Sequence, residues 1–84
     1  MPAELRLTKR FQKSFEKLDR ITRDRVEKAV GELADNPRLG KSLKGELDGE
    51  WSLRVGEYRV LYSVDKAIVW IETVRHRKDV YRAV

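Results

Sequence analysis

Residues 51–62 read WSLRVGEYRVLY, and apolar and polar side chains alternate on both sides of Gly56-Glu57. Alternation with a period of two indicates β-strands that bury one face. A two-residue Gly-X separator is typical of a type II′ hairpin turn, which here pairs Val55 with Tyr58 and Trp51 with Tyr62. The segment therefore predicts an antiparallel hairpin with one apolar face, formed by Trp51, Leu53, Val55, Tyr58, Val60 and Tyr62.

The same register places Arg54 directly opposite Arg59 on the other face of the hairpin. Like charges opposed across two strands destabilise a sheet unless an anion lies between them. The residues alone leave two interpretations open. In the first, the arginines hold a phosphate, whose oxygens match guanidinium groups in bidentate fashion. In the second, the next hairpin closes at Asp65-Lys66, so that Glu72 lies opposite Arg59 and neutralises it.

The segments around the hairpin predict further strands and helices. Residues 67–75 form the third strand of an antiparallel meander, and residues 3–7 alternate like a short N-terminal strand. Thr8 then offers an N-cap to a helix whose apolar face carries Phe11, Phe15 and Leu18. A second helix is expected at about 21–35, ended by the Asn36-Pro37 dipeptide.

Few residues separate the two helices around Asp19, so we expect them to form an antiparallel hairpin. Residues 38–49 are expected to be an ordered loop pinned by Leu39, Leu43 and Leu47. The predicted fold class is α+β, in one domain over residues 1–84. It consists of a short N-terminal strand, the helix hairpin and a three-stranded antiparallel meander, with the helices packed on one face of the sheet.

Composition excludes several classes of site. The 84 residues contain no cysteine and a single histidine, His76, which excludes disulfides, thiolate metal sites and a histidine cluster. The longest apolar run, Ala67–Ile71, is far too short to cross a bilayer. We therefore expect a soluble cytoplasmic protein without a membrane partner. The net charge of +5 favours encounters with polyanions, although a well-solvated surface explains it equally well.

A basic tail follows the last predicted strand, with Arg75, His76, Arg77, Lys78 and Tyr81 close together. Basic side chains beside an aromatic ring suit RNA, since arginine binds phosphate and tyrosine stacks on an exposed base. The alternative is a solvated basic terminus. An imidazole near neutral pH is also suited to proton transfer, which makes His76 a candidate general base.

These motifs together resemble the RelE branch of the RelE/ParE toxin superfamily. The resemblance rests on LKG at 43–45, WSLRVGEYRVLY at 51–62 and HRKDVY at 76–81, in the expected order of elements, and covers nearly the whole chain. It implies a RelE-like fold and a toxin that enters the ribosomal A site and cleaves messenger RNA there by attack of a ribose 2′-hydroxyl. It implies no metal and no cofactor.

The resemblance also implies partners: the ribosome with its message, and a cognate RelB-like antitoxin that neutralises the toxin in a heterodimer or heterotetramer. Among the residues, it implies that Arg59 holds the scissile phosphate, that Arg77 lies by the same phosphate or the leaving oxygen, and that Tyr81 orients the nucleotide. Further RNA contacts are expected from Lys44, Arg54, Arg75 and Lys78.

The sequence departs from the family pattern on the first strand of the meander. The best-known members carry lysines where this chain has Glu50 and Ser52. The general base is therefore open between Glu50, His76, Tyr81 and none at all. Two alternative functions stay open too: a ParE-like inhibitor of DNA gyrase, and a catalytically inactive relative that only binds its antitoxin or RNA. A simple nucleic-acid-binding module explains the charge but not the motif order.

Overall fold

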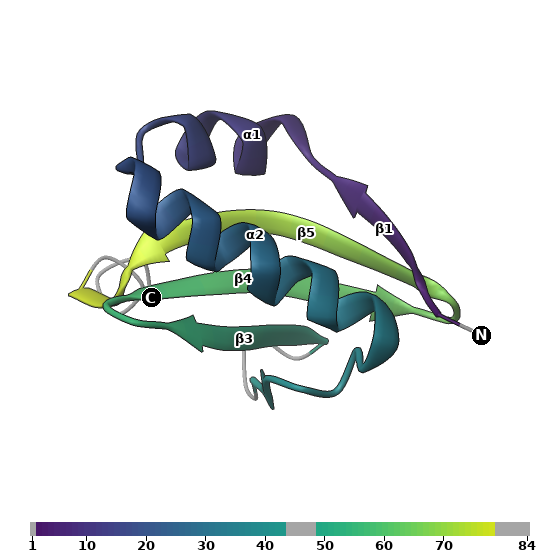
Figure 1. The fold of residues 1–84 in the computed structure, drawn as a ribbon. Coiled ribbons are helices and arrows are strands. Elements are labelled where there is room, and N and C mark those ends of the chain that lie inside the picture. Colours follow the sequence, from purple (N-terminus) through teal and green to yellow (C-terminus); the bar gives the residue numbers. More distant parts are fainter. Residues whose placement is uncertain (1, 44–48, 79–84) are drawn as a thin grey trace.

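The computed structural model describes residues 2–43 and 49–78 of the chain. A mixed sheet and two helices make up this part, as Figure 1 shows. In chain order the elements are β1 (Glu4–Leu7), α1 (Lys9–Glu16), α2 (Arg20–Asp35), β2 (Lys41–Ser42), β3 (Glu50–Val55), β4 (Tyr58–Asp65) and β5 (Ile68–His76). The α+β class and the order of elements are confirmed. Neither described helix is long and apolar enough to span a membrane.

The five strands lie in the order β1-β5-β4-β3-β2. β1 runs parallel to β5, and the other neighbouring strands are antiparallel. In the β3–β4 hairpin Val55 pairs with Tyr58, and the pairing continues in step to Trp51 and Tyr62. The register predicted from the Gly56-Glu57 turn is confirmed.

α2 crosses the front face of the sheet (Figure 1), and its apolar stripe is buried there. Val26 and Leu33 on this helix are fully buried, and Trp51 stacks on Tyr62 with ring centroids 6.1 Å apart. The core consists of Phe11, Val26, Val30, Leu33, Val60, Tyr62, Val69, Ile71 and Val74. Burial of each such side chain contributes about 1.5 to 3 kcal/mol, so this single layer supplies most of the stability of a short chain.

α1 covers the stretch of β5 whose edge away from β4 is not paired with β1. Thr8 is the N-cap: its Oγ1 accepts a hydrogen bond from the Phe11 N–H (3.0 Å) and donates one to the Glu72 carbonyl (2.8 Å). Farther along the helix, Ser14 Oγ accepts a hydrogen bond from the Val74 N–H (3.2 Å). Side chains of α1 thus satisfy backbone groups that a neighbouring strand would otherwise bond.

The turn between the helices differs slightly from the expectation. α1 ends at Glu16, so Leu18, whose spacing placed it on the helix, lies in the turn and packs against the core from there. Asp19 is the N-cap of α2, and its carboxylate accepts a hydrogen bond from the Thr22 N–H. Hydrogen bonding to Thr22 lowers the pKa of Asp19. The early stop lets α2 cross the sheet while α1 stays at its edge.

Tyr62 anchors the segment after α2. Its hydroxyl donates a hydrogen bond to the Pro37 carbonyl (2.9 Å) and accepts one from the Gly40 N–H (3.0 Å). Leu39 is 42% exposed and so does not pin the segment as expected. Gly40 lies so close to β3 that a Cβ there would stand 2.5 Å from the Ser52 carbonyl oxygen. This close approach requires glycine.

β2 is a strand that the sequence does not predict. It pairs Lys41 with Ser52 and Ser42 with Trp51, and so extends the sheet beyond β3. Neither Lys nor Ser favours strands, and the pairing arises because the segment anchored by Tyr62 passes along the unpaired edge of β3. Leu47, the third leucine of the expected loop, lies outside the described residues.

Replacement of Tyr62 by phenylalanine tests this anchor. Tyr62→Phe keeps the ring in the core but leaves the Pro37 carbonyl and the Gly40 N–H without their partner, which costs about 1 to 3 kcal/mol of unfolding free energy. Urea unfolding measures the loss, with Tyr58→Phe as the control. An unchanged urea midpoint for Tyr62→Phe shows that the hydroxyl does not hold the segment.

Candidate functional site

The rear face of the sheet, opposite α2, carries a row of three arginines. The register pairs Arg54 with Arg59 on β3 and β4, and Arg59 with Arg75 on β5. Arg54 is exposed, and the other two are half-buried. The row therefore concentrates three positive charges on one part of this face. The predicted opposition of Arg54 and Arg59 is confirmed, and Arg75 is added to it.

The expected pairing of Arg59 with Glu72 is wrong. The second hairpin turns through Lys66-Ala67, one residue later than expected, with Asp65 paired to Ile68 and Lys66 at a positive φ of 55°. A β-bulge between Leu61 and Tyr62 then shifts the register by one further residue. Arg59 therefore lies opposite Arg75, and the bulge leaves Glu72 without a cross-strand partner in the register.

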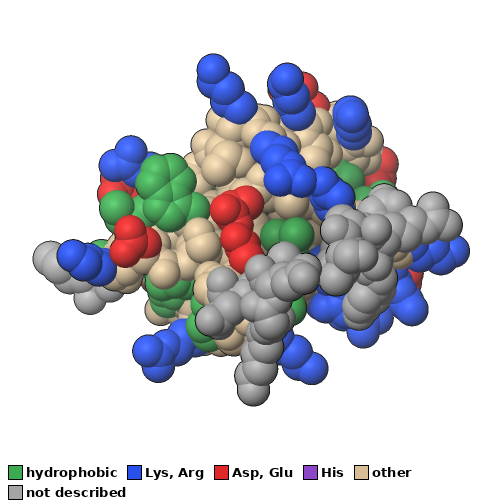
Figure 2. Space-filling model, turned by 180° about the vertical axis from the view of Figure 1, so that it is seen from behind, with side chains coloured by type: hydrophobic (Ala, Val, Ile, Leu, Met, Phe, Trp, Pro, Cys, Tyr) green, Lys and Arg blue, Asp and Glu red, His purple; other side chains and the backbone are tan. Residues whose placement is uncertain are grey.

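The bulge contributes to the second feature of the rear face, a pair of carboxyl groups. Glu72 shares a hydrogen bond with Glu50 on β3. Burial, then this hydrogen bond, then the charge of Glu72 raise the pKa of Glu50 to about 7, while Arg10 acts in the opposite direction. Figure 2 shows acidic side chains near the centre of this face and Lys and Arg around them. A carboxyl group with this pKa is suited to proton transfer at neutral pH.

Ser52 adds a buried hydroxyl to the same face. It follows Glu50 by two residues, so both side chains lie on one side of β3. Its Oγ is buried and has no hydrogen-bond partner in the described part of the chain. A buried hydroxyl without a partner costs free energy, so the arrangement favours a ligand that can bond to it.

The basic tail divides between the two sides of the sheet. His76 pairs with Tyr58 on the α2 side, the two rings meeting edge to face at 5.3 Å, and its Nδ1 accepts a hydrogen bond from the Lys78 N–H (3.3 Å). Arg77 bonds to Glu57, both through its N–H and through an exposed ion pair of 3.7 Å. Such an exposed pair is weak, so the Arg77 guanidinium can exchange Glu57 for another anion.

The structure thus gathers part of the predicted site. Glu50 lies on the rear face with Arg54, Arg59 and Arg75, whereas His76 faces the other way. Lys44 and Tyr81 lie outside the described residues, and their roles stay predictions. Within residues 2–43 and 49–78, no group of three His, Cys, Asp or Glu residues is arranged to hold a metal ion.

The sequence reasoning missed Glu72 as a site residue. Residues 68–71 are all apolar, so alternation along β5 does not show which of them face the core. Only the buried set, Val69, Ile71 and Val74, shows the change of parity that the β-bulge causes. Arg10 carries no sequence signal either, because only the packing of α1 at the sheet edge brings it near Glu50.

Comparison with known proteins gives consistent results. The family described as "ParE toxin of type II toxin-antitoxin system, parDE" matches residues 5–81. Toxin RelG of Mycobacterium tuberculosis is 43% identical, over 98% of this chain and 99% of that protein. The toxin–antitoxin complex RelBE2 of M. tuberculosis contains a chain that superposes with a TM-score of 0.80 and 41% identity, covering 92% of this chain and 100% of that one. A chain of the RelB–RelE complex of Methanococcus jannaschii superposes with a TM-score of 0.76 and 26% identity, covering 92% of this chain and 95% of that one.

The carboxyl pair predicts an unusual dependence of stability on pH. The pKa of Glu50 is about 7 in the folded state and 4.5 for an ordinary glutamate. Between these two pH values the native state therefore holds more protons than the unfolded chain, so the free energy of unfolding falls as pH rises through this range. Glu50→Gln removes this loss. Because the pair is partly exposed and screened by solvent, we expect the variant to gain about 1 kcal/mol at pH 8 and little at pH 4. Urea unfolding at both pH values measures the gain, with Glu32→Gln on α2 as control; equal gains at both pH values contradict the assignment.

Proposed function

This chain belongs to the RelE branch of the type II toxin–antitoxin toxins, and we propose that it is a ribosome-dependent endoribonuclease that cuts messenger RNA in the A site. The observation that carries the proposal is the arginine row beside the Glu50–Glu72 pair on the rear face. Cations that bind a phosphate and a group that accepts a proton near neutral pH are what cleavage by a ribose hydroxyl requires. An activity that needs the ribosome places the chain in the cytoplasm.

In the proposed reaction, Arg59 holds the scissile phosphate and stabilises the charge that grows on it. The 2′-oxygen forms a bond to phosphorus while the bond to the 5′-oxygen of the next nucleotide breaks, which leaves a cyclic phosphate and a free hydroxyl. Arg77 neutralises the leaving oxygen, which takes a proton from solvent, and Tyr81 orients the nucleotide. No step needs a metal ion or a cofactor.

Glu50 is our candidate for the general base. It stands on the strand where the best-known relatives carry lysines, and its raised pKa of about 7 leaves a useful fraction of carboxylate at neutral pH. Burial raises the pKa of Glu50 most, and its partner Glu72 raises it further through a hydrogen bond and through repulsion between the two charges. His76 faces the α2 side of the sheet, which makes it a weaker candidate.

A RelB-like antitoxin is the proposed inhibitor. Two of the similar solved structures are complexes of this kind of toxin with an antitoxin. An acidic segment of such a partner, laid over Arg54, Arg59 and Arg75, neutralises the aligned charges as a phosphate does. The proposed complex is a heterodimer or heterotetramer, in which the antitoxin excludes RNA from the rear face.

Inhibition of DNA gyrase is a second candidate function, favoured by the ParE description of the matching family. Cleavage of a defined message on programmed ribosomes separates the two, with the cut sites mapped. Cuts at A-site codons support the nuclease. An intact message together with reduced supercoiling by gyrase supports the alternative, and no effect in either assay indicates an inactive relative that only binds.

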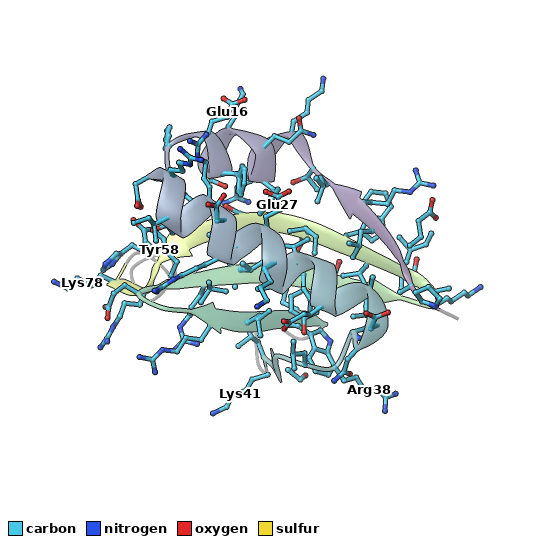
Figure 3. All side chains as sticks on the ribbon, in the orientation of Figure 1. Glu16, Glu27, Arg38, Lys41, Tyr58 and Lys78 are labelled. Carbon is cyan, nitrogen blue, oxygen red and sulfur yellow. The ribbon has the colours of Figure 1, made fainter. Side chains whose placement is uncertain are left out.

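Arg59→Ala and Arg77→Ala test the phosphate contacts. If each guanidinium stabilises the transition state by about 3 kcal/mol, each variant loses roughly two powers of ten in cleavage rate on programmed ribosomes. Arg38→Ala is the matched control, since Arg38 is exposed at the opposite end of the molecule from Tyr58 and Lys78, as Figure 3 shows. Rates equal to the control remove the tested arginine from the site.

The pH profile of cleavage tests the base. With Glu50 as base, the rate rises with pH up to a pKa of about 7, and Glu50→Gln removes this rise together with most of the activity. Glu72→Gln removes the neighbouring charge, lowers the pKa of Glu50 and moves the rise to lower pH. The same profile in Glu72→Gln as in the unaltered chain contradicts the coupling of the two carboxyl groups.

A further inference from the structure

We propose that a cleft between α1 and the end of β5 binds a second nucleotide of the cut RNA strand, next to the scissile phosphate. This inference rests on the proposed ribonuclease activity. The cleft has a volume of about 690 Å³, within the range of small-molecule sites. Its basic lining consists of Arg10, Lys13, Lys17, Arg75 and His76, and no acidic residue of the described chain lines it.

The sequence of α1 separates its basic face from its core face. Arg10, Ser14 and Lys17 follow each other at helical spacing and line the cleft together with Lys13. Phe11 and Phe15 lie on the other side, against the core and each other. Because Ser14 is hydrogen-bonded to the Val74 N–H on β5, the basic face is held against the sheet edge and cannot turn away from the cleft.

No ion pair found in the described part of the chain involves a cleft residue. The ion pairs found there join Arg6 to Glu4 and Arg77 to Glu57. Arg10 acts on the carboxyl group of Glu50, so it lies at the boundary between the cleft and the rear face. A concave site lined by several cations and by no described acidic residue attracts a phosphate backbone. In Figure 2, Lys and Arg side chains gather along the edge where α1 lies.

Two rings favour RNA over an acidic protein segment as the occupant. Tyr58 and His76 both line the cleft, and their edge-to-face contact across β4 and β5 fixes their orientation. Figure 3 shows Tyr58 and Lys78 at the same end of the sheet. Aromatic rings beside basic side chains are the combination that binds single-stranded nucleic acid, because every base can stack on a ring. An acidic peptide would bind through the cations alone and would have no use for the two rings.

Arg75 connects the cleft to the proposed cleavage site. It belongs to the arginine row, opposite Arg59, and it also lines the cleft. Adjacent strands are about 5 Å apart, so these two guanidinium groups can hold successive parts of one backbone. A strand whose scissile phosphate is bound at Arg59 therefore leads past Arg75 into the cleft, where Lys13 and Lys17 meet the next phosphate.

Binding of a fluorescent single-stranded RNA with 2′-O-methyl groups, which cannot be cut, tests the cleft on the complete purified chain. The double variant Lys13→Ala with Lys17→Ala is compared with Lys28→Ala with Lys66→Ala, which removes the same charge at exposed positions outside the cleft. We expect the cleft variant to bind at least about tenfold more weakly. The slope of log affinity against log salt concentration falls by about 0.7 for each phosphate that the variant no longer neutralises, and the control keeps the slope.

Tyr58→Leu tests the stacking separately. We expect its affinity for the same RNA to fall about fivefold or more with no change in the salt slope, because stacking is uncharged, while Tyr58→Phe binds normally. Urea unfolding of each variant shows that the protein remains folded. Normal binding by Tyr58→Leu overturns the role of the ring.

The outcomes distinguish this inference from the proposed function. Loss of RNA affinity in the cleft variant supports the cleft even if the unaltered chain cuts no message on ribosomes. Conversely, a chain that cuts messages but whose cleft variant binds RNA like the control overturns the inference and leaves the nuclease intact. The inference is also overturned if the unaltered chain binds no RNA at low salt, or if the cleft variant loses affinity only for an antitoxin.

Discussion

The pairing of Val55 with Tyr58 across the β3–β4 turn is the constraint on which the rest of the structure depends. Side chains of a strand alternate between its two faces, so this one pairing decides what each face of the sheet carries. It directs Val60 and Tyr62 toward α2 and aligns Arg54 with Arg59 on the rear. A register shifted by one residue would bury the arginines and expose the core. The stability of the fold therefore enforces the alignment of the arginines from which the proposed phosphate site arises.

The bulge in β5 modifies this pattern at one point. It inserts Glu72, changes the faces of the residues that follow, and brings Arg75 into the arginine row in place of the expected ion pair. The same residue hydrogen-bonds to Glu50 and helps to raise its pKa. One extra residue thus places Arg75 rather than Val74 opposite Arg59 and supplies a proton-sharing pair nearby. Bulges commonly lie next to functional sites for this reason.

The short β1 has a comparable effect at the edge of the sheet. Because β1 ends early, part of the edge of β5 that faces away from β4 has no neighbouring strand, and Thr8 and Ser14 of the α1 segment bond to its backbone instead. A helix at a sheet edge presents one face to the core and another to the solvent. In this chain the second face is basic, and the junction between it and β5 forms the cleft that adjoins the arginine row.

The sequence by itself determined every described element except β2. It also determined the β3–β4 register, the apolar face and the opposition of Arg54 and Arg59, because each follows from periodicity and turn chemistry within a few residues. The family motifs further indicated Glu50 and Arg77 as site residues. Only the tertiary structure decided the partner of Arg59 in the register, the pairing of Glu72 with Glu50 and the position of α1 beside Arg75. These depend on a turn placed one residue later, on a bulge and on the Tyr62 and Ser14 hydrogen bonds between distant segments. Such long-range contacts are selected by the free energy of the whole packed chain, which no local pattern contains.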